Sequence, residues 1–307
     1  MSKTILLFPG QGAQYVGMGK TIADSYEPAK KLLKRADEVL GFSLSKIMQE
    51  GPEEVLKSTD NTQPALYTCS CMVMEYLREN GTHFDFVAGH SLGEYSAIAA
   101  AGGFSFEEGL QLVRTRGNLM AKAGELKPGA MAAVLGLTED ELNSALQEAR
   151  SAGVVVAANF NSPGQIVISG SKEGVAKAEE TATAKGAKRV VPLPVSGAFH
   201  SPLMEYAVEG LKAALAKTTF KDLSVPLIAN VNSQAITKGS ELPELLARQL
   251  TSPVRWQQGM EEAASLSVEK GIEVGSGKVL MGLMRSINRN IKVYPVENEE
   301  QYKAIPQ

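Results

Sequence analysis

The strongest chemical signal in the chain is a G-x-S-x-G motif, Gly89-His90-Ser91-Leu92-Gly93. This motif needs a strand before it and a helix after it, and we expect Phe84-Asp85-Phe86-Val87-Ala88 to form that strand and Glu94-Tyr95-Ser96-Ala97 to begin that helix. The two glycines allow a sharp turn that presents the serine oxygen at the carboxyl edge of a sheet. The predicted chemistry is acyl transfer through a covalent ester on Ser91.

A serine nucleophile needs a base, and the chain contains three histidines, His83, His90 and His200. His83 precedes the expected strand at its far end, about one strand length from the turn, so we expect it to be out of reach. His90 adjoins Ser91, but neighbours on a tight turn usually point apart. His200 is therefore the predicted general base.

The surroundings of His200 favour a neutral imidazole. Ser201 can serve as an N-cap and Pro202 suits the first helical position, so a helix should begin directly after His200. A helix N-terminus disfavours imidazolium and so helps His200 to accept a proton. Acids between the serine and His200, including Asp140, fall mostly on expected helix faces, so a backbone carbonyl would have to orient the ring in a Ser-His dyad. A histidine that only satisfies its own hydrogen bonds at a helix start is the alternative.

Arg116 is expected on an apolar helix face. It shares that face with Leu112, Val113, Leu119 and Met120. A guanidinium in such surroundings must meet an anion, because an unpaired buried charge is costly. Two alternatives stay open, a structural ion pair with a protein carboxylate and a bidentate clamp for a substrate carboxylate.

Other motifs in the chain predict no further site. Cys69 and Cys71 lie two residues apart on an expected helix, and small buried apolar side chains are the favoured interpretation. The segment 10–15 lacks the third glycine of a dinucleotide fingerprint. The segment 275–279 lacks the upstream glycine and the final Ser or Thr of a phosphate loop.

Composition narrows the class of protein. The chain has 307 residues, with 31 Lys and Arg against 34 Asp and Glu and a formal net charge of −3. No basic stripe favours nucleic acid as a partner. No stretch approaches the roughly 18 apolar residues of a membrane span, and no signal peptide is evident. We expect a soluble, cytoplasmic protein without membrane association, and a monomer, because no spare apolar surface helix stands out.

The order of expected elements predicts an α/β fold with a hydrolase-like, mostly parallel sheet. Buried strands at 4–8 and 84–88 alternate with helices at about 63–80, 94–101 and 106–123, the last of which opens with the capping box Ser105-Phe106-Glu107-Glu108. After residue 202, helices are expected at 202–216, 241–250 and 279–287, with strands at 225–229 and 272–274.

Residues 129–195 follow a different pattern. Strands are expected at 131–137, 154–158, 165–169 and 189–195, with helices at 138–152 and 172–185. This βαββαβ order is that of the ferredoxin-like fold. We therefore predict an inserted ferredoxin-like subdomain at 124–195 within a catalytic domain made of 1–123 and 196–307.

In combination, these segments resemble a known family. The chain is similar to the malonyl-CoA:acyl carrier protein transacylases, within the acyltransferases of fatty-acid and polyketide synthesis, over nearly its whole length. The motifs that carry the resemblance are Phe8-Pro9-Gly10-Gln11-Gly12, Gln63-Pro64-Ala65, Gly89 to Glu94, Arg116, Asn159 to Gln165, Gly197-Ala198-Phe199-His200, Gln249 with Pro253 to Trp256, and Glu273 to Leu280.

The resemblance implies a ping-pong transfer. Ser91 would attack the malonyl thioester with His200 as general base, and the backbone N–H groups of Gln11 and Leu92 would hold the oxyanion. Arg116 would hold the malonyl carboxylate. The substrates would be a coenzyme A thioester and the phosphopantetheine thiol of acyl carrier protein, with no cofactor and no metal.

The resemblance also assigns residues around the pocket. His90, Asn161 and Gln63 match pocket positions, and relatives orient the histidine through the backbone carbonyl at the position of Gln249. The pair Leu92 and Phe199 fits the malonyl-selective pattern rather than the methylmalonyl one, and an extra methyl group in a pocket costs about 1–3 kcal/mol.

Three alternatives remain open at the level of sequence. A serine esterase or thioesterase would share Ser91 and His200 without needing Arg116. A free-standing acyltransferase could serve polyketide synthesis instead of fatty-acid synthesis. A non-catalytic carrier-binding protein is disfavoured by the intact Ser91, His200 and Arg116.

Overall fold

The computed structural model describes residues 3–195 and 197–306. Its centre is a six-stranded sheet, sheet A, in which every neighbouring pair is parallel except the short β7–β8 pair at one edge. The mostly parallel sheet predicted from the sequence is therefore confirmed. In spatial order the strands are β10 (Lys292–Val296), β9 (Val268–Val274), β1 (Lys3–Phe8), β2 (Phe86–Gly89), β7 (Leu227–Ile228) and β8 (Ala235–Ile236).

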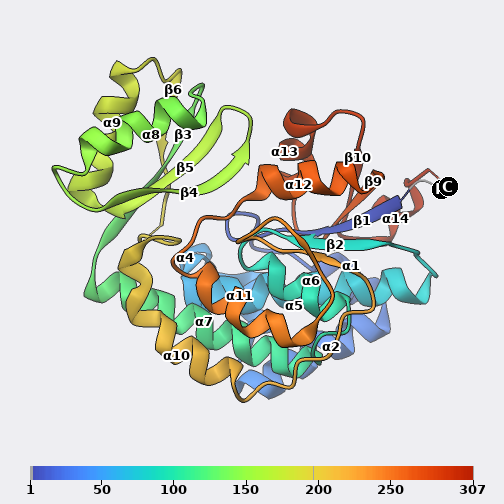
Figure 1. Cartoon of the computed structure of the whole chain (residues 1–307). Helices are drawn as coiled ribbons and strands as arrows, with labels where there is room; N and C mark the ends of the chain where they lie inside the picture. Colours follow the sequence, from blue (N-terminus) through green and yellow to red (C-terminus); the bar gives the residue numbers. More distant parts are fainter. Residues whose placement is uncertain (1–2, 196, 307) are drawn as a thin grey trace.

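Helices cover both faces of sheet A, which explains why its central strands are apolar throughout. In β1, Leu6 and Phe8 pack into one hydrophobic core, while Ile5 and Leu7 pack into another on the opposite face. Figure 1 shows α12 and α13 on one side of the sheet and α5, α6 and α7 on the other.

The helices predicted around sheet A are present, with differences at several ends, but the structure has more helices there than were predicted. Their bounds are α1 (Lys20–Ser25), α2 (Glu27–Leu40), α3 (Leu44–Glu50), α4 (Glu53–Lys57), α5 (Thr59–Glu79), α6 (Gly93–Ala100), α7 (Phe106–Leu126), η1 (Pro202–Met204), α10 (Glu205–Leu215), η2 (Gly239–Glu241), α11 (Leu242–Gln249), α12 (Trp256–Ser265), α13 (Val279–Ile287) and α14 (Glu299–Lys303).

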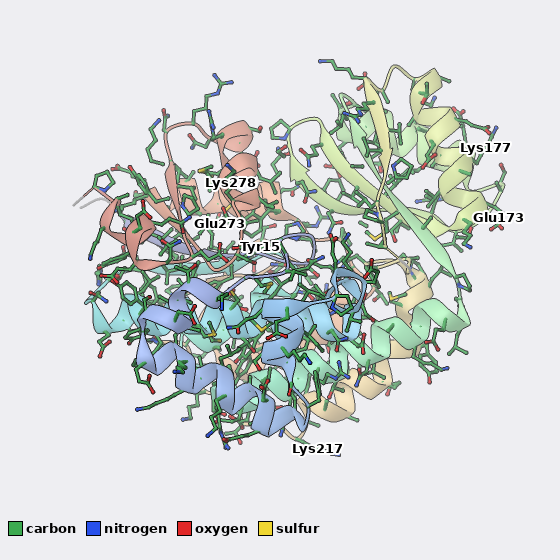
Figure 2. The ribbon with its side chains drawn as sticks, turned by 180° about the vertical axis from the view of Figure 1, so that it is seen from behind. Tyr15, Glu173, Lys177, Lys217, Glu273 and Lys278 are labelled. Carbon is green, nitrogen blue, oxygen red and sulfur yellow. The ribbon has the colours of Figure 1, made fainter. Side chains whose placement is uncertain are left out.

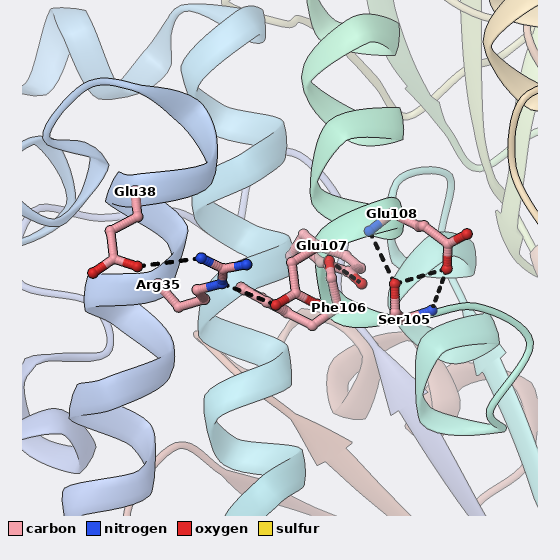
Figure 3. A network of polar contacts seen from close by, with 7 residues as sticks. Arg35, Glu38, Ser105, Phe106, Glu107 and Glu108 are labelled. Atoms are coloured by element: carbon pink, nitrogen blue, oxygen red, sulfur yellow. Dashed lines mark hydrogen bonds and ion pairs between the residues drawn. The ribbon is translucent and has the colours of Figure 1, made fainter.

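The start of α7 is fixed by the predicted capping box. Ser105 Oγ accepts from the N–H of Glu108, and the Glu108 carboxylate accepts from the N–H of Ser105. Beside it, Arg35 of α2 donates to Glu107 at 3.0 Å and to Glu38 at 3.3 Å, which links α2 to α7 (Figure 3). The cap sets the first residue of the helix that carries Arg116.

The predicted start of α5 was wrong. The helix begins at Thr59, so Pro64 lies inside it instead of opening it. A proline there cannot donate to the carbonyl of Asp60. Arg114 of α7 donates to that carbonyl instead, at 2.5 Å, and also to the Asp60 carboxylate at 3.2 Å. The lost helical bond is thus replaced by one from a neighbouring helix.

A second, antiparallel sheet, sheet B, lies to one side of sheet A with two helices packed on it (Figure 1). Its strand order, β4-β5-β3-β6, is that of a ferredoxin-like βαββαβ unit. Figure 2 shows this part from behind, with Glu173 and Lys177 labelled on α9. The elements are β3 (Gly129–Leu135), α8 (Glu139–Ala149), β4 (Val155–Ser162), β5 (Gln165–Ser171), α9 (Lys172–Ala184) and β6 (Arg189–Pro192).

We propose that sheet B and its helices are the inserted subdomain predicted at 124–195. A separate hydrophobic core between sheet B and its helices supports the proposal. The division at residue 123 stays a prediction, since α7 continues to Leu126. The limits at 1, 196 and 307 lie outside the described residues.

Several details differ from prediction. Asn161 and Ser162 end strand β4 instead of belonging to a loop, so only two residues connect β4 and β5. Strand β6 ends at Pro192 rather than at 195. Cys69 is buried, but Cys71 is only partly so. The short strands β8 and β10 were not predicted, and neither were the helices α1, α3, α4, α12 and α14. Within the described residues, none of the helices combines the length and apolar character needed to cross a membrane.

Candidate active site

The turn that carries Ser91 is as tight as the motif predicts. It connects the end of β2 at Gly89 to the start of α6 at Gly93, and Ser91 itself has a positive φ of 51°. A Cβ at Gly89 would lie 1.9 Å from the carbonyl of Gly93, and one at Gly93 would lie 2.0 Å from the oxygen of Phe8. Both positions therefore require glycine, and the serine is held in a strained conformation at the carboxyl edge of sheet A.

His200 meets Ser91 across 109 residues of sequence. The Ser91 Oγ lies 2.8 Å from Nε2 of His200. His200 also has a positive φ, 58°, and the predicted N-cap follows it, with Ser201 Oγ accepting from the N–H of Leu203. The helix that begins there is a single 3₁₀ turn, Pro202–Met204, that leads into α10.

The other ring nitrogen of His200 fixes its tautomer. Nδ1 lies 2.8 Å from the backbone oxygen of Gln249, so it must carry the hydrogen, which leaves Nε2 free to accept from Ser91. Burial, together with the positive charge of Arg116, lowers the pKa of His200 to about 3. The ring is therefore neutral at physiological pH and able to act as a base.

Arg116 is buried on α7 and points at the same serine. Its Nη2 donates to Ser91 Oγ at 3.1 Å and to Oε1 of Gln249 at 2.8 Å, and its Nη1 donates to Oε1 of Gln63 at 2.9 Å. Its Nε has no hydrogen-bond partner among the described residues, and none of its hydrogen bonds to them goes to a carboxylate. The ring of Tyr95 lies 5.5 Å from the guanidinium carbon. The cation is thus held by neutral groups.

A cavity of about 100 Å³ lies where these groups meet. Seven of the predicted site residues line it: Gln11, His90, Ser91, Leu92, Arg116, Phe199 and His200. The backbone N–H groups of Gln11 and Leu92 donate to no other described residue, which leaves both available to an oxyanion.

Three predicted pocket residues lie behind the cavity wall instead of lining it. Gln63 and Gln249 hold Arg116 from behind through their amide oxygens. Asn161 Oδ1 accepts a hydrogen bond from Nε2 of His90 at 2.8 Å, which fixes the orientation of that ring. These residues support the lining side chains, and the resemblance alone could not distinguish support from contact.

Sequence reasoning missed two buried polar residues beside the nucleophile. Glu94 was taken only as the start of a helix, where an acid usually faces solvent, yet it is 1% exposed. Asn230 accepts from the N–H of Ser91 at 2.8 Å and donates to the oxygen of Gly89 at 2.7 Å. Its position just after a strand of the parallel sheet was a signal that could have found it.

Sheet B contributes one wall of the cavity. Met131 and Asn159 come from its strands, while Leu193 and Val195 follow β6. With Met120 of α7 they make the lining mainly apolar apart from the polar groups around Ser91.

The segment 275–279 has a different function from the phosphate loop it partly resembles. The carboxylate of Glu273 accepts from the N–H groups of Leu280 at 2.9 Å and Met281 at 2.8 Å, at the start of α13. Figure 2 labels Glu273 and Lys278 at this helix end. A protein carboxylate thus occupies the position that a bound phosphate would need.

Comparison with known proteins gives consistent matches over the whole chain. The family described as acyl transferase domain matches residues 5–306. Malonyl CoA-acyl carrier protein transacylase from Bacillus subtilis is 46% identical over 98% of this chain and 95% of the relative. The protein of that name from Escherichia coli K12 is 43% identical over 94% of this chain and 93% of its own length.

Comparison with solved structures gives matches to proteins of the same kind. An acyl-carrier-protein S-malonyltransferase from Bartonella henselae superposes with a TM-score of 0.96 at 42% identity, covering 98% of both chains. A malonyl-transacylase solved in complex with a type II PKS acyl-carrier protein superposes with a TM-score of 0.95 at 36% identity, covering 98% of this chain and 97% of that one.

Proposed function

Because this chain belongs to the acyl transferase family, we propose that it transfers the malonyl group of malonyl-CoA to the phosphopantetheine thiol of acyl carrier protein. The observation that carries the choice of substrate is Arg116, a buried cation that is held by amide oxygens and faces the cavity beside Ser91. An acyl group with a free carboxylate would supply the missing negative charge.

In the first half-reaction, Ser91 gives its proton to Nε2 of His200 as Oγ attacks the thioester carbonyl. The N–H groups of Gln11 and Leu92 stabilise the oxyanion, and such donors contribute roughly 3 kcal/mol each. The C–S bond then breaks, and the coenzyme A sulfur takes the proton from His200. The product is a malonyl ester on Ser91.

In the second half-reaction, the carrier thiol gives its proton to the neutral His200, and its sulfur attacks the ester carbonyl. The bond to Ser91 breaks, and the serine oxygen recovers the proton. The backbone carbonyl of Gln249 holds the imidazole in one tautomer throughout, in the position that a carboxylate has in a triad.

Two neighbours of the reacting atoms limit the acyl group. Leu92 and Phe199 both line the small cavity, so branching at the α-carbon of the acyl group would crowd them. We propose malonyl as the preferred group on this ground.

The proposal also concerns which carrier protein accepts the malonyl group and which pathway it serves. A relative of the same fold was solved with a type II PKS acyl-carrier protein, whereas the names of the curated relatives specify acyl carrier protein without a pathway. We propose a fatty-acid carrier and keep polyketide synthesis as the alternative. A cytoplasmic location, a monomeric state and the lack of a cofactor stay predictions from the sequence.

The test is mass spectrometry after incubation with malonyl-CoA. We expect one malonyl adduct on the peptide that contains Ser91, and none in Ser91→Ala. Adding the phosphopantetheinylated carrier should discharge the adduct onto the carrier, whereas water alone should discharge it slowly. Rapid discharge to free malonate without a carrier would favour a thioesterase, and the absence of any adduct would refute the proposal.

A further inference from the structure

Glu94 is a buried carboxylate that the mechanism above does not use. It lies in the first turn of α6, three residues after the nucleophile, and is 1% exposed. Its Oε1 accepts from the N–H of Asn230 at 2.8 Å, and its Oε2 accepts from Nε2 of Gln249. Both of its oxygens are thus engaged by neutral donors, a backbone N–H and a side-chain amide.

The bond from Gln249 to Glu94 determines how the Gln249 amide is turned. An amide has a donor end and an acceptor end, whereas an ionised carboxylate only accepts. The donor end of Gln249 therefore faces Glu94 and, at 3.0 Å, the backbone oxygen of Ser91. The acceptor end then faces Nη2 of Arg116 at 2.8 Å.

A flipped amide would reverse this arrangement. It would place an NH₂ group against the guanidinium of Arg116 and a carbonyl oxygen against Glu94, so two favourable contacts would become repulsive. Because Arg116 Nη2 bonds both Gln249 and Ser91 Oγ, loss of the first bond would free the guanidinium to turn away from the reacting atoms.

The same residues connect Glu94 to the nucleophile turn. Asn230, held by Glu94 through its N–H, accepts from the N–H of Ser91 at 2.8 Å. Gln249 also presents its backbone oxygen to His200. One buried carboxylate is thus linked through two amides to the groups that surround the cavity.

We propose that Glu94 is a positioning residue that fixes the Gln249 amide, aims Arg116 at the carboxylate of the acyl group, and so sets the preference for malonyl over uncharged acyl groups. The inference rests on the proposed function and deepens it. Glu94 reaches no cavity-lining position itself, and its link to Arg116 runs through Gln249.

Glu94→Gln tests the proposal. Glutamine has nearly the same shape as glutamate, but it has one acceptor oxygen for the two donors, the N–H of Asn230 and Nε2 of Gln249. Transfer from malonyl-CoA and from acetyl-CoA would be measured in parallel at about pH 8. Burial raises the pKa of Glu94 to about 7, so the wild-type carboxylate is mostly ionised under these conditions. We expect the malonyl-to-acetyl ratio of kcat/KM to fall by about 10- to 100-fold, the effect of one charge-assisted hydrogen bond.

A matched control is Ser96→Ala on the same helix. Ser96 is as deeply buried as Glu94, and its hydroxyl has no partner among the described residues, so this variant should keep the wild-type ratio. If Glu94→Gln does not fold, Glu94→Asp keeps the charge with a shorter reach and should show a smaller loss of the ratio.

The outcomes separate this inference from the proposed function. A wild-type protein that forms no malonyl-Ser91 adduct refutes the function. A wild-type protein that forms it, with a Glu94 variant that lowers malonyl and acetyl transfer equally or leaves both unchanged, refutes the positioning role alone.

Discussion

Replacing Arg116 with alanine is the sharpest single perturbation of this site. The guanidinium is buried, has an unpartnered Nε, and donates to the nucleophile from Nη2. A malonyl carboxylate would accept two charge-assisted hydrogen bonds from it, at about 1.5–3 kcal/mol each. The transition state for malonyl transfer should therefore lose about 3–6 kcal/mol, which lowers kcat/KM by roughly 10²- to 10⁴-fold.

Acetyl transfer should respond in the opposite direction. An acetyl group offers no carboxylate, so it loses nothing when the guanidinium is removed. The positive charge of Arg116 also helps to depress the pKa of His200, so its removal makes the imidazole a stronger base. We expect acetyl transfer by Arg116→Ala to be unchanged or faster.

The assay follows the formation of acyl-carrier product from malonyl-CoA and acetyl-CoA with the same enzyme samples. Lys122→Ala removes an exposed cation from the same helix and should leave both rates unchanged. The loss of Arg116 leaves the oxygens of Gln63 and Gln249 without donors, at about 1–3 kcal/mol each, so folding is checked by thermal melting. Equal losses for malonyl and acetyl in a folded variant would contradict the anion clamp.

Three further predictions concern stability. Gly93→Ala would place a Cβ 2.0 Å from the oxygen of Phe8, so it should abolish activity and lower the melting temperature sharply, and a normal melt would contradict the packing argument. Ser105→Ala removes the α7 cap and should cost about 1 kcal/mol in urea unfolding with little change in kcat, whereas no loss would mean that the cap is not stabilising. His200 has a pKa of about 3 when folded against 6.5 when unfolded, so the unfolded state binds more protons and stability falls as pH drops below 6.5. The unfolding free energy of wild type minus that of His200→Gln should therefore decrease by roughly 1.5–2 kcal/mol between about pH 6.5 and pH 5, and a constant difference would show that the histidine is not buried neutral.

The local parts of the site could be predicted because their causes are contiguous in sequence. An apolar strand, two glycines around Ser91 and a following helix specify the nucleophile turn without reference to the rest of the chain. The same holds for the cap at Ser105 and for the N-cap at Ser201. Each cap depends on residues within three positions of one another, and the nucleophile turn depends on a single continuous segment.

Contacts between residues far apart in the sequence could be predicted only indirectly. The approach of His200 to Ser91 spans 109 residues and was inferred by elimination among three histidines. The start of α5 was misplaced because a proline such as Pro64 usually lies at the first position of a helix. Inside α5 this proline is tolerated because Arg114, from another helix, donates to the carbonyl that the proline leaves without a helical partner. A sequence pattern does not contain such a tertiary partner.

The charge state of the cavity is where the structure adds most. An arginine on an apolar helix face indicates that an anion binds it. The sequence does not distinguish a carboxylate of the protein from a carboxylate of the substrate as that anion. Here the groups that hold Arg116 are the amide oxygens of Gln63 and Gln249, which stabilise a guanidinium without cancelling its charge. The one carboxylate in this network, Glu94, is separated from Arg116 by the Gln249 amide. Glu94 interacts electrostatically with Arg116 across that amide, but the guanidinium makes no hydrogen bond to a carboxylate of the described residues. An anionic acyl group in the cavity is the ligand that would make this direct contact.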